Sequence, residues 1–290
     1  MRQATSRTGA LVVLKTIAES NDSERRLLQY LGGINAPSNH TIPLLDLINL
    51  SIDKTIIALP WKSPLDEVLQ FRDRPDDVVS LCLQFIEGVA FLHQHKVAHC
   101  DLKPGNVVVD TISESETLPR LFIIDLDLAQ SVESEETMTE GWRGTPAWIA
   151  PELGSRDGPT QRYSPILADR WACGRMVKYF AKYFPTYEGA AKTMLLAFAQ
   201  RLLDVNPGAR PELNELQVIH GPTKRKSTRT QREPLPKRHA VRLLSNFDIV
   251  IVPYFVGDSR HKNHCLSARQ LNTRRLRYNR QCRRWTSDLC

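Results

Sequence analysis

Residues 99–106 read His-Cys-Asp-Leu-Lys-Pro-Gly-Asn, and this is the most informative stretch of the 290-residue sequence for predicting its fold. It carries an acid, a cation and an amide within six residues. The apolar residues before it recur every three or four positions, which predicts an amphipathic helix over 77–93 that packs on a core. Residues 106–110, Asn-Val-Val-Val-Asp, read as a strand. The polar groups therefore lie on a short loop between a helix and a strand.

A second strand, over 121–125, ends on another acid after two isoleucines. Phosphoryl transfer needs a bound triphosphate, metal ions that neutralise its charge, and an acceptor hydroxyl in line with the γ-phosphorus. We expect Asp101 to orient that hydroxyl and take its proton, and Lys103 to offset the charge on the γ-phosphate. Asn106 and Asp125 are the expected ligands of Mg²⁺, because this ion favours oxygen ligands.

These motifs, in this order, give the chain a resemblance to the eukaryotic protein kinases over residues 10–220. Lys15, at the end of Val-Val-Leu-Lys, matches the lysine with which the family binds nucleotide. Glu24 is the best candidate for the partner of that lysine on the following helix. Residues 144–152, Gly-Thr-Pro-Ala-Trp-Ile-Ala-Pro-Glu, match the end of the family's activation segment.

The resemblance also implies structural roles. Residues 169–174 are similar to the helix that lies behind the family's catalytic loop, where Asp169 would brace the backbone of the loop. Arg210, just before a proline, would pair with Glu152. The apolar pattern and the helix-start residues predict further helices at 165–180, 187–203 and 211–219.

The fold that the resemblance implies is a two-lobed, kinase-like α+β fold. We expect a small, incomplete, β-rich lobe over 1–61 and a larger helical lobe over 62–220. Within the small lobe, strands are expected at 11–16, 42–52 and 55–59, and a helix near 24–31.

The activity that the resemblance implies is that of a protein serine/threonine kinase, with ATP and Mg²⁺ as cofactors. A lysine two residues after the catalytic aspartate, with Thr145 in the segment that faces it, is the family's serine/threonine pattern. In the connection between the lobes, Pro60 would offer adenine its carbonyl alone, because proline has no N–H. Lys62 would donate its backbone N–H.

The main departure from the family lies ahead of Lys15. The family places a Gly-x-Gly-x-x-Gly loop there, whereas Gly9 is the single glycine among the first 14 residues of this sequence. Such glycines let backbone N–H groups approach the phosphates closely. Either this nucleotide lid is missing or the sequence is a shortened version of a longer protein. The alternative function is therefore a catalytically weak or inactive pseudokinase that acts as an adaptor.

Three further departures concern control and substrate binding. Cys100 replaces the arginine that receives an activation-loop phosphate in the family, so control by such phosphorylation is not expected. Leu126 and Asp127 stand where Phe-Gly is usual, and Asp127 adds a negative charge near the metal site. The interval 174–210 is shorter than the family usually needs, which indicates a reduced or absent substrate-docking helix.

The last part of the sequence, 221–290, has a different charge from the rest. It holds 17 of the 39 basic residues and 4 of the 32 acidic ones, a net charge of +13 against −6 for the rest. We expect a basic, disordered tail that binds an anionic partner. The clusters at 224–229 and 237–238 resemble a two-part nuclear import signal read by an import receptor, and nucleic acid is the second candidate partner.

The composition is that of a globular protein, with 41% hydrophobic and 24% charged residues. No apolar run reaches the roughly 18 residues of a membrane span, and no signal peptide is recognisable, so we expect a soluble, intracellular protein. The six cysteines form no Cys-x-x-Cys pair, which favours reduced thiols.

Overall fold

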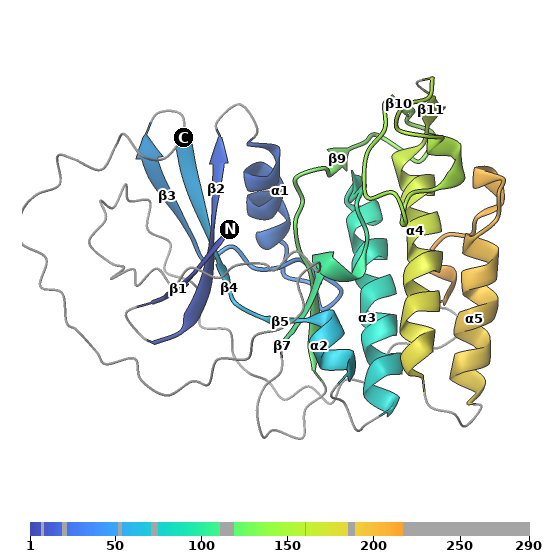
Figure 1. Ribbon diagram of the computed structural model, residues 1–290, viewed down its shortest axis with the longest axis horizontal. Helices are drawn as coiled ribbons and strands as arrows, with labels where there is room; N and C mark the ends of the chain where they lie inside the picture. The colour runs from blue at the N-terminus through green and yellow to red at the C-terminus, as the bar shows by residue number, and fades with distance from the viewer. Residues whose placement is uncertain are drawn as a thin grey trace, which may run out of the picture. The chain divides into compact units, whose positions relative to one another are not determined.

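The computed structural model describes residues 1–216 apart from 7–8, 19–21, 52–53, 71–74, 111–118, 160 and 185–188 (Figure 1). The described residues combine α-helices with antiparallel strands, and the four-stranded sheet lies within the first 60 residues, as expected for an α+β protein. The expected basic tail at 221–290, with both of its predicted import clusters, lies outside the described residues. No helix in the described part of the chain has the length and apolar character needed to cross a bilayer.

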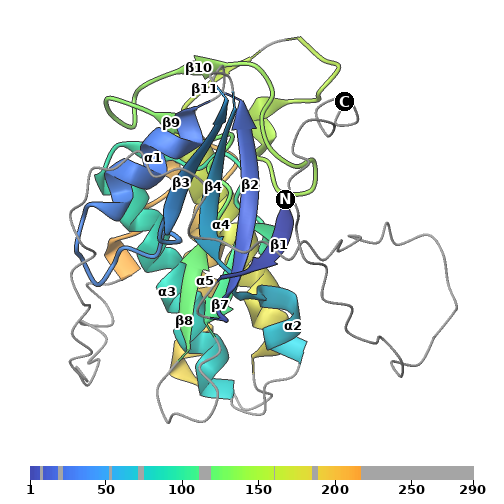
Figure 2. The ribbon, with the colours of Figure 1, turned by 90° about the vertical axis from the view of Figure 1, so that its left-hand side faces the viewer.

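Four antiparallel strands form the amino-terminal sheet, in the order β1-β2-β4-β3 (Figure 2). The strands are β1 (Arg2–Thr5), β2 (Leu11–Ala18), β3 (Asp46–Ser51) and β4 (Lys54–Pro60). The β-branched and aliphatic run of β2 suits a central strand, and alternate side chains point to opposite faces. Val12 and Leu14 pack with Ala58 on one face of the sheet, which leaves Lys15 on the other.

Two strands differ from what the sequence led us to expect. Strand β1, which pairs with β2, was not predicted. The strand expected at 42–52 begins at Asp46, because the preceding residues bond elsewhere: the Ile42 N–H donates to the Ile123 carbonyl at 3.1 Å. The edge strand β3 is therefore shorter than expected.

Helix α1 (Ser23–Gly32) follows β2 and carries Glu24 towards the core. Leu27, Leu28 and Leu31 are buried, and Glu24 lies on the same face because these positions are three, four and seven residues apart. The periodicity that buries the leucines thus also buries a carboxylate.

The remaining helices form the helical region, in which α3, α4 and α5 lie side by side (Figure 1). They are α2 (Leu65–Gln70), α3 (Pro75–Gln94), α4 (Pro165–Phe180) and α5 (Ala190–Leu202). Phe85 of α3 and Phe180 of α4 are fully buried, with ring centroids 6.1 Å apart. The sequence predicts the bounds of α4 correctly but not the short helix α2. The helix expected at 211–219 lies partly outside the described residues, and no helix of the described part covers 211–214.

Short strands and 3₁₀ turns complete the described chain. The strands are β5 (Ser63–Pro64), β6 (Val97–Ala98), β7 (Val107–Asp110), β8 (Arg120–Ile123), β9 (Gln130–Ser131), β10 (Thr139–Glu140) and β11 (Arg162–Tyr163). The 3₁₀ turns are η2 (Pro104–Asn106), η3 (Pro151–Leu153), η4 (Ala181–Tyr183) and η5 (Pro207–Ala209).

The pair β7 and β8 positions the expected site. The two strands are antiparallel, with Val107 opposite Ile123. The residue before β7 and the residues after β8 therefore lie at the same end of the pair. Strand β8 stops at Ile123, so Asp125 lies just beyond the strand rather than at its last position, with a left-handed backbone (φ +65°).

Candidate active site

Asp101 is the centre of a tight hydrogen-bonded group in the loop that joins β6 to β7. The Lys103 Nζ atom donates to Asp101 Oδ2 at 2.6 Å and to Thr145 Oγ1 at 2.8 Å. The Thr145 hydroxyl donates to Asp101 Oδ1 at 2.7 Å. Asp101 is 8% exposed, so these bonds form where water competes little. The two residues expected to act in transfer are thus in contact, and Thr145 bridges them.

Asn106 is fixed by the same loop. Its side-chain amide donates to the Asp101 carbonyl at 2.9 Å and to Asp101 Oδ2 at 3.1 Å. These bonds use both amide hydrogens, so the side-chain oxygen is the atom that can bind a metal ion. The Ile124 N–H donates to the Asn106 carbonyl at 3.0 Å, which ties Asn106 to the residue before Asp125.

Asp169 of α4 braces the backbone of the loop, as the sequence analysis expected. The N–H groups of His99 and Cys100 donate to its two carboxylate oxygens, at 2.6 and 2.9 Å. His93 Nε2 of α3 lies 3.2 Å from Asp169 Oδ2. Asp169 is 1% exposed. These contacts hold Cys100 in a left-handed backbone conformation (φ +63°), which costs a non-glycine residue about 1 kcal/mol or more.

His99 links the loop to the segment that carries Asp125. The Asp101 N–H donates to His99 Nδ1 at 3.3 Å, and His99 Nε2 lies 3.0 Å from the Ile124 carbonyl. An acceptor at Nδ1 requires the proton on Nε2, so Nε2 is the atom that donates to Ile124. The imidazole therefore spans the two segments that bear the expected metal ligands.

Lys15 of β2 gathers three carboxylates around one ammonium group. Its Nζ atom lies 2.7 Å from Glu24 Oε2, 2.7 Å from Asp125 Oδ1 and 3.0 Å from Asp127 Oδ2. We call these four residues the Lys15 cluster. Glu24 Oε1 also accepts from the Leu126 N–H at 3.2 Å, so α1 is bonded to the segment after β8.

Burial shifts the ionisation of this cluster. Burial alone would lower the pKa of Lys15, but hydrogen bonds to Asp125 and Glu24 outweigh it, and the pKa is raised. For Glu24, burial raises the pKa to about 7, against the opposing effect of Lys15. The ammonium is therefore firmly charged, whereas Glu24 exchanges its proton near neutral pH.

The cluster carries the donor atoms that Mg²⁺ requires. One carboxylate oxygen from each of Glu24, Asp125 and Asp127 lies within 4.8 Å of the others. One ammonium against three carboxylates leaves a net charge of −2 when all are ionised, which a divalent cation offsets. Oxygen ligands of this kind fit Mg²⁺.

The two residues expected to hold adenine lie at the end of β4. Pro60 is the last residue of the strand and stands opposite Val12 of β2, three residues before Lys15. The side chain of Lys62 turns to β7, where its Nζ atom lies 2.7 Å from Asp110 Oδ2. The side chain of Lys62 thus has a structural partner, and its backbone N–H is the group expected to reach a nucleotide.

Two arginines anchor the segment between β9 and β11, which carries Glu135 and Glu152. Arg210 forms a two-pronged ion pair with Glu152, with distances of 2.6 and 2.8 Å, which confirms the predicted pairing. Arg170 of α4 forms a further ion pair with Glu135. Arg170 and Arg210 are both buried, so breaking either pair would leave a buried charge without its partner.

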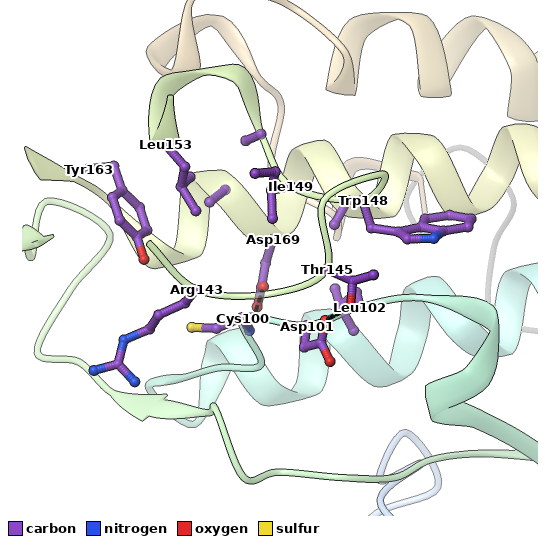
Figure 3. A pocket seen from close by; sticks show the side chains of 13 residues that line it. Cys100, Asp101, Leu102, Arg143, Thr145, Trp148, Ile149, Leu153, Tyr163 and Asp169 are labelled. Atoms are coloured by element: carbon purple, nitrogen blue, oxygen red, sulfur yellow. Dashed lines mark hydrogen bonds between the residues drawn. The ribbon is translucent and has the colours of Figure 1, made fainter. Parts of the chain in front are cut away.

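Cys100 lies beside a very small cavity of about 20 Å³, large enough for one water molecule. Figure 3 shows Cys100, Asp101, Thr145 and Asp169 around it. Burial, and next the negative charge of Asp169, raise the pKa of the Cys100 thiol. The residue that replaces the family's arginine is therefore a neutral, partly buried thiol.

Several contacts were not predicted from the sequence. The ion pair between Asp127 and Lys15 was partly indicated by the sequence, because Asp127 lies two residues after the expected metal ligand Asp125. The contacts of His93 with Asp169 and of Arg170 with Glu135 join residues 76 and 35 positions apart, and no motif marks them.

Comparison with known proteins agrees with this geometry. Residues 2–206 match the family model described as protein kinase domain. Serine/threonine-protein kinase 17A of Oryctolagus cuniculus is 38% identical over 100 residues, which are 34% of this chain and 22% of that protein. CBL-interacting serine/threonine-protein kinase 18 of Arabidopsis thaliana is 30% identical over 154 residues, 46% of this chain and 28% of that protein. Death-associated protein kinase 2 of Homo sapiens is 32% identical over 101 residues, 34% of this chain and 25% of that protein. The matched stretches thus span less than a third of these relatives.

Proposed function

Because the chain belongs to the protein kinase family, we propose that it is a serine/threonine kinase that transfers the γ-phosphate of ATP to a protein hydroxyl. The observation that carries this proposal is the contact between Asp101, Lys103 and Thr145. It puts a carboxylate, an ammonium and an aliphatic hydroxyl within hydrogen-bonding distance of one another. The names of the relatives support the serine/threonine class.

In this proposal Asp101 orients the acceptor. The Thr145 hydroxyl already donates to Asp101 Oδ1 at 2.7 Å, so this oxygen accepts from an alcohol in the protein itself. A serine or threonine hydroxyl of the substrate would make the same kind of bond and pass its proton to the carboxylate as the phosphorus–oxygen bond forms. The Lys103 ammonium, next to the same carboxylate, would stabilise the charge on the γ-phosphate.

The nucleotide would lie between the Lys15 cluster and the end of β4. Lys15 would bind the phosphates. Its side chain is oriented by the ion pair with Glu24, a buried residue of α1. The Pro60 carbonyl and the Lys62 N–H would bind adenine. Asn106 and Asp125 would hold Mg²⁺, which when bound neutralises phosphate charge.

Transfer of label from γ-labelled ATP to a mixed protein substrate tests the proposal. We expect Asp101→Asn to lower incorporation by about 10²- to 10⁴-fold, because the amide cannot take the proton. Asp157→Asn, the same change at an exposed loop residue, is the matched control and should retain activity. Equal incorporation by the wild type and Asp101→Asn would overturn the assignment.

The second candidate function is a non-catalytic adaptor. The observation that favours it is the engagement of the Lys15 ammonium by Asp127 in addition to Glu24 and Asp125. A ligand that binds the native state alone must stabilise it, by about 2.7 kcal/mol at 100 times its Kd. A thermal shift with Mg²⁺ and ATP therefore separates the two, because no shift at millimolar nucleotide would favour the adaptor.

A further inference from the structure

A groove of about 490 Å³ opens between α4 and α5, away from the Lys15 cluster. We call it the basic groove and define it by three aromatic side chains, Trp148, Trp171 and Tyr179, and three cations, Arg175, Lys178 and Lys182. Gln200 of α5 and Leu203, which follows that helix, close its other wall. None of the described residues that line it is acidic.

The spacing of the residues along α4 and η4 creates this face. Trp171, Arg175, Lys178 and Lys182 are separated by four, three and four positions, so their side chains follow one side of the helix. The opposite side of α4, with Cys173, Met176, Val177 and Phe180, is buried in the core. The helix therefore packs with one face and presents an aromatic and basic stripe with the other.

Within the described part of the chain, the cations of the groove contact rings and an amide rather than carboxylates. The Arg175 guanidinium lies 5.9 Å from the ring centroid of Trp148, and Lys182 Nζ lies 5.3 Å from that of Tyr179. Lys178 Nζ donates to Gln200 Oε1 at 3.4 Å. All three side chains are exposed. Their charges are therefore available to an anionic ligand, and the rings beside them offer apolar surface.

We propose that the basic groove docks an acidic segment of the protein substrate, with carboxylates on either side of an apolar side chain. Charge complementarity carries the proposal, because three cations face a groove whose described lining holds no acid. One carboxylate lies beside it, that of Asp66, which accepts from the Tyr179 hydroxyl at 2.5 Å, and the three cations outnumber it. The chain's own residues 221–290 are not the occupant, since their net charge of +13 would be repelled.

The position of the groove connects it to the substrate. The backbone N–H of Trp148 donates to the Thr145 carbonyl at 2.8 Å, and the Thr145 hydroxyl donates to Asp101. One wall of the groove is thus a single turn of chain from the group that would orient the acceptor. Between Phe180 and Ala190, the described residues contribute one 3₁₀ turn, η4, and no longer helix that covers this face.

Fluorescence anisotropy with a labelled Glu-Glu-Phe-Glu-Glu peptide tests docking without catalysis, using the Asp101→Asn full chain so that no phosphate is transferred. We expect Lys178→Glu/Lys182→Glu to weaken binding about tenfold, and the Gln-Gln-Phe-Gln-Gln peptide to bind the unaltered groove about tenfold more weakly. Binding should weaken further between low and 0.5 M salt.

Lys182→Glu alone has a matched control in Lys54→Glu. Both lysines are exposed and neither has a carboxylate partner among the ion pairs of the described residues, but Lys54 lies on β4. Lys54→Glu should bind the acidic peptide as the parent does. Circular dichroism of each variant separates lost docking from lost folding.

The proposal rests on the proposed function, and the outcomes separate the two. Equal affinity for the acidic and glutamine peptides, or unchanged binding after the double reversal, would overturn docking. If the parent protein dimerises and Lys178→Glu/Lys182→Glu abolishes the dimer, the groove binds a second copy of the chain. That result would also overturn the docking proposal. If the wild type binds the peptide but transfers no phosphate, the docking proposal holds and the proposed kinase activity is overturned.

Discussion

The loop that joins β6 to β7 and the Lys15 cluster are built from similar side chains but differ in charge balance. In the loop, the Asp101 carboxylate meets one ammonium, that of Lys103, and one hydroxyl, that of Thr145. In the cluster, a single ammonium meets three carboxylates. The loop is electrically close to neutral, whereas the cluster has more negative charge than its lysine can offset.

This difference separates two tasks. The loop needs no additional ion to hold its groups together, because hydrogen bonds from Asn106 and the backbone brace of Asp169 already fix them. The cluster favours the arrival of a cation, and in the proposed function its lysine would shift from carboxylates towards the phosphates of the nucleotide. We therefore expect changes in the loop to affect turnover and changes in the cluster to affect nucleotide binding and stability.

After that of Asp101→Asn, the largest expected effect is on turnover, from Lys103→Met. The methionine keeps the length of the side chain but cannot donate to Asp101 or Thr145. We expect kcat to fall by about 10²- to 10³-fold, with the KM for ATP changed less than threefold. Steady-state kinetics over a range of ATP concentrations measure both. A large rise in KM with an unchanged kcat would contradict the separation of tasks.

The second prediction concerns the pH dependence of stability at Glu24, in buffer free of divalent metal. Because burial raises its pKa from 4.5 to about 7, the folded protein keeps a proton that the unfolded chain releases above pH 4.5. The unfolding free energy of the wild type should therefore fall relative to Glu24→Gln as the pH rises from about 5 to about 7, by roughly 1–3 kcal/mol.

Urea unfolding at pH 5, 6, 7 and 8 measures this difference. The loss of the ion pair with Lys15 adds a contribution to the difference in unfolding free energy that does not depend on pH. It does not affect the test, because the test uses only the change of this difference with pH. A difference that is flat between pH 5 and pH 7, or that grows in favour of the wild type, would contradict the raised pKa.

The third prediction is a moderate gain from Asp127→Gly. Removing this carboxylate leaves Lys15 with two partners and lowers the negative charge that a triphosphate would meet. Asp127 is 39% exposed on its side chain, so water weakens its interaction, and we expect ATP to bind only about three- to tenfold more tightly. Isothermal titration calorimetry with Mg²⁺ and ATP measures the affinity. Weaker binding would show that Asp127 helps to hold the metal–nucleotide complex.

The smallest effect is expected at Cys100, within the loop itself. Burial raises the pKa values of Cys82, Cys100 and Cys173, and alkylation requires the thiolate. We expect iodoacetamide at pH 8 to leave all three unlabelled in the native protein and to label them after unfolding in urea, as read by peptide mass spectrometry. Labelling of native Cys100 would show that the loop opens more readily than its bracing implies.

Part of the loop could be predicted from the sequence because the contacts among its three polar residues are local, whereas its contacts with Thr145 and Asp169 are not. Asp101, Lys103 and Asn106 lie within six residues, so the bonds among them depend on one turn of chain. The bounds of α4 follow in the same way from a serine, a proline and an apolar period. Contacts between residues that are close in sequence can be predicted from a short stretch of sequence.

The cluster was only partly predictable, because its members come together through tertiary packing. Lys15 and Asp125 are 110 positions apart, and no local pattern states that Asp127 also reaches the lysine. The strand β1 was missed for a related reason: four residues with mixed polarity become a strand because β2 offers them an edge. The basic groove depends on how α4 packs, which no motif specifies.

The ion pair between Glu152 and Arg210 has a consequence for how far the folded unit extends. The match to the kinase family ends at residue 206, yet Arg210 is 2% exposed, and Leu213 and Leu216 are buried in the main core. A recombinant protein trimmed at the family boundary would lose the guanidinium that faces Glu152 and two core leucines. Limited proteolysis should accordingly leave residues 207–216 attached to the folded unit, which makes residue 216 the earliest sound end point for a crystallisation fragment.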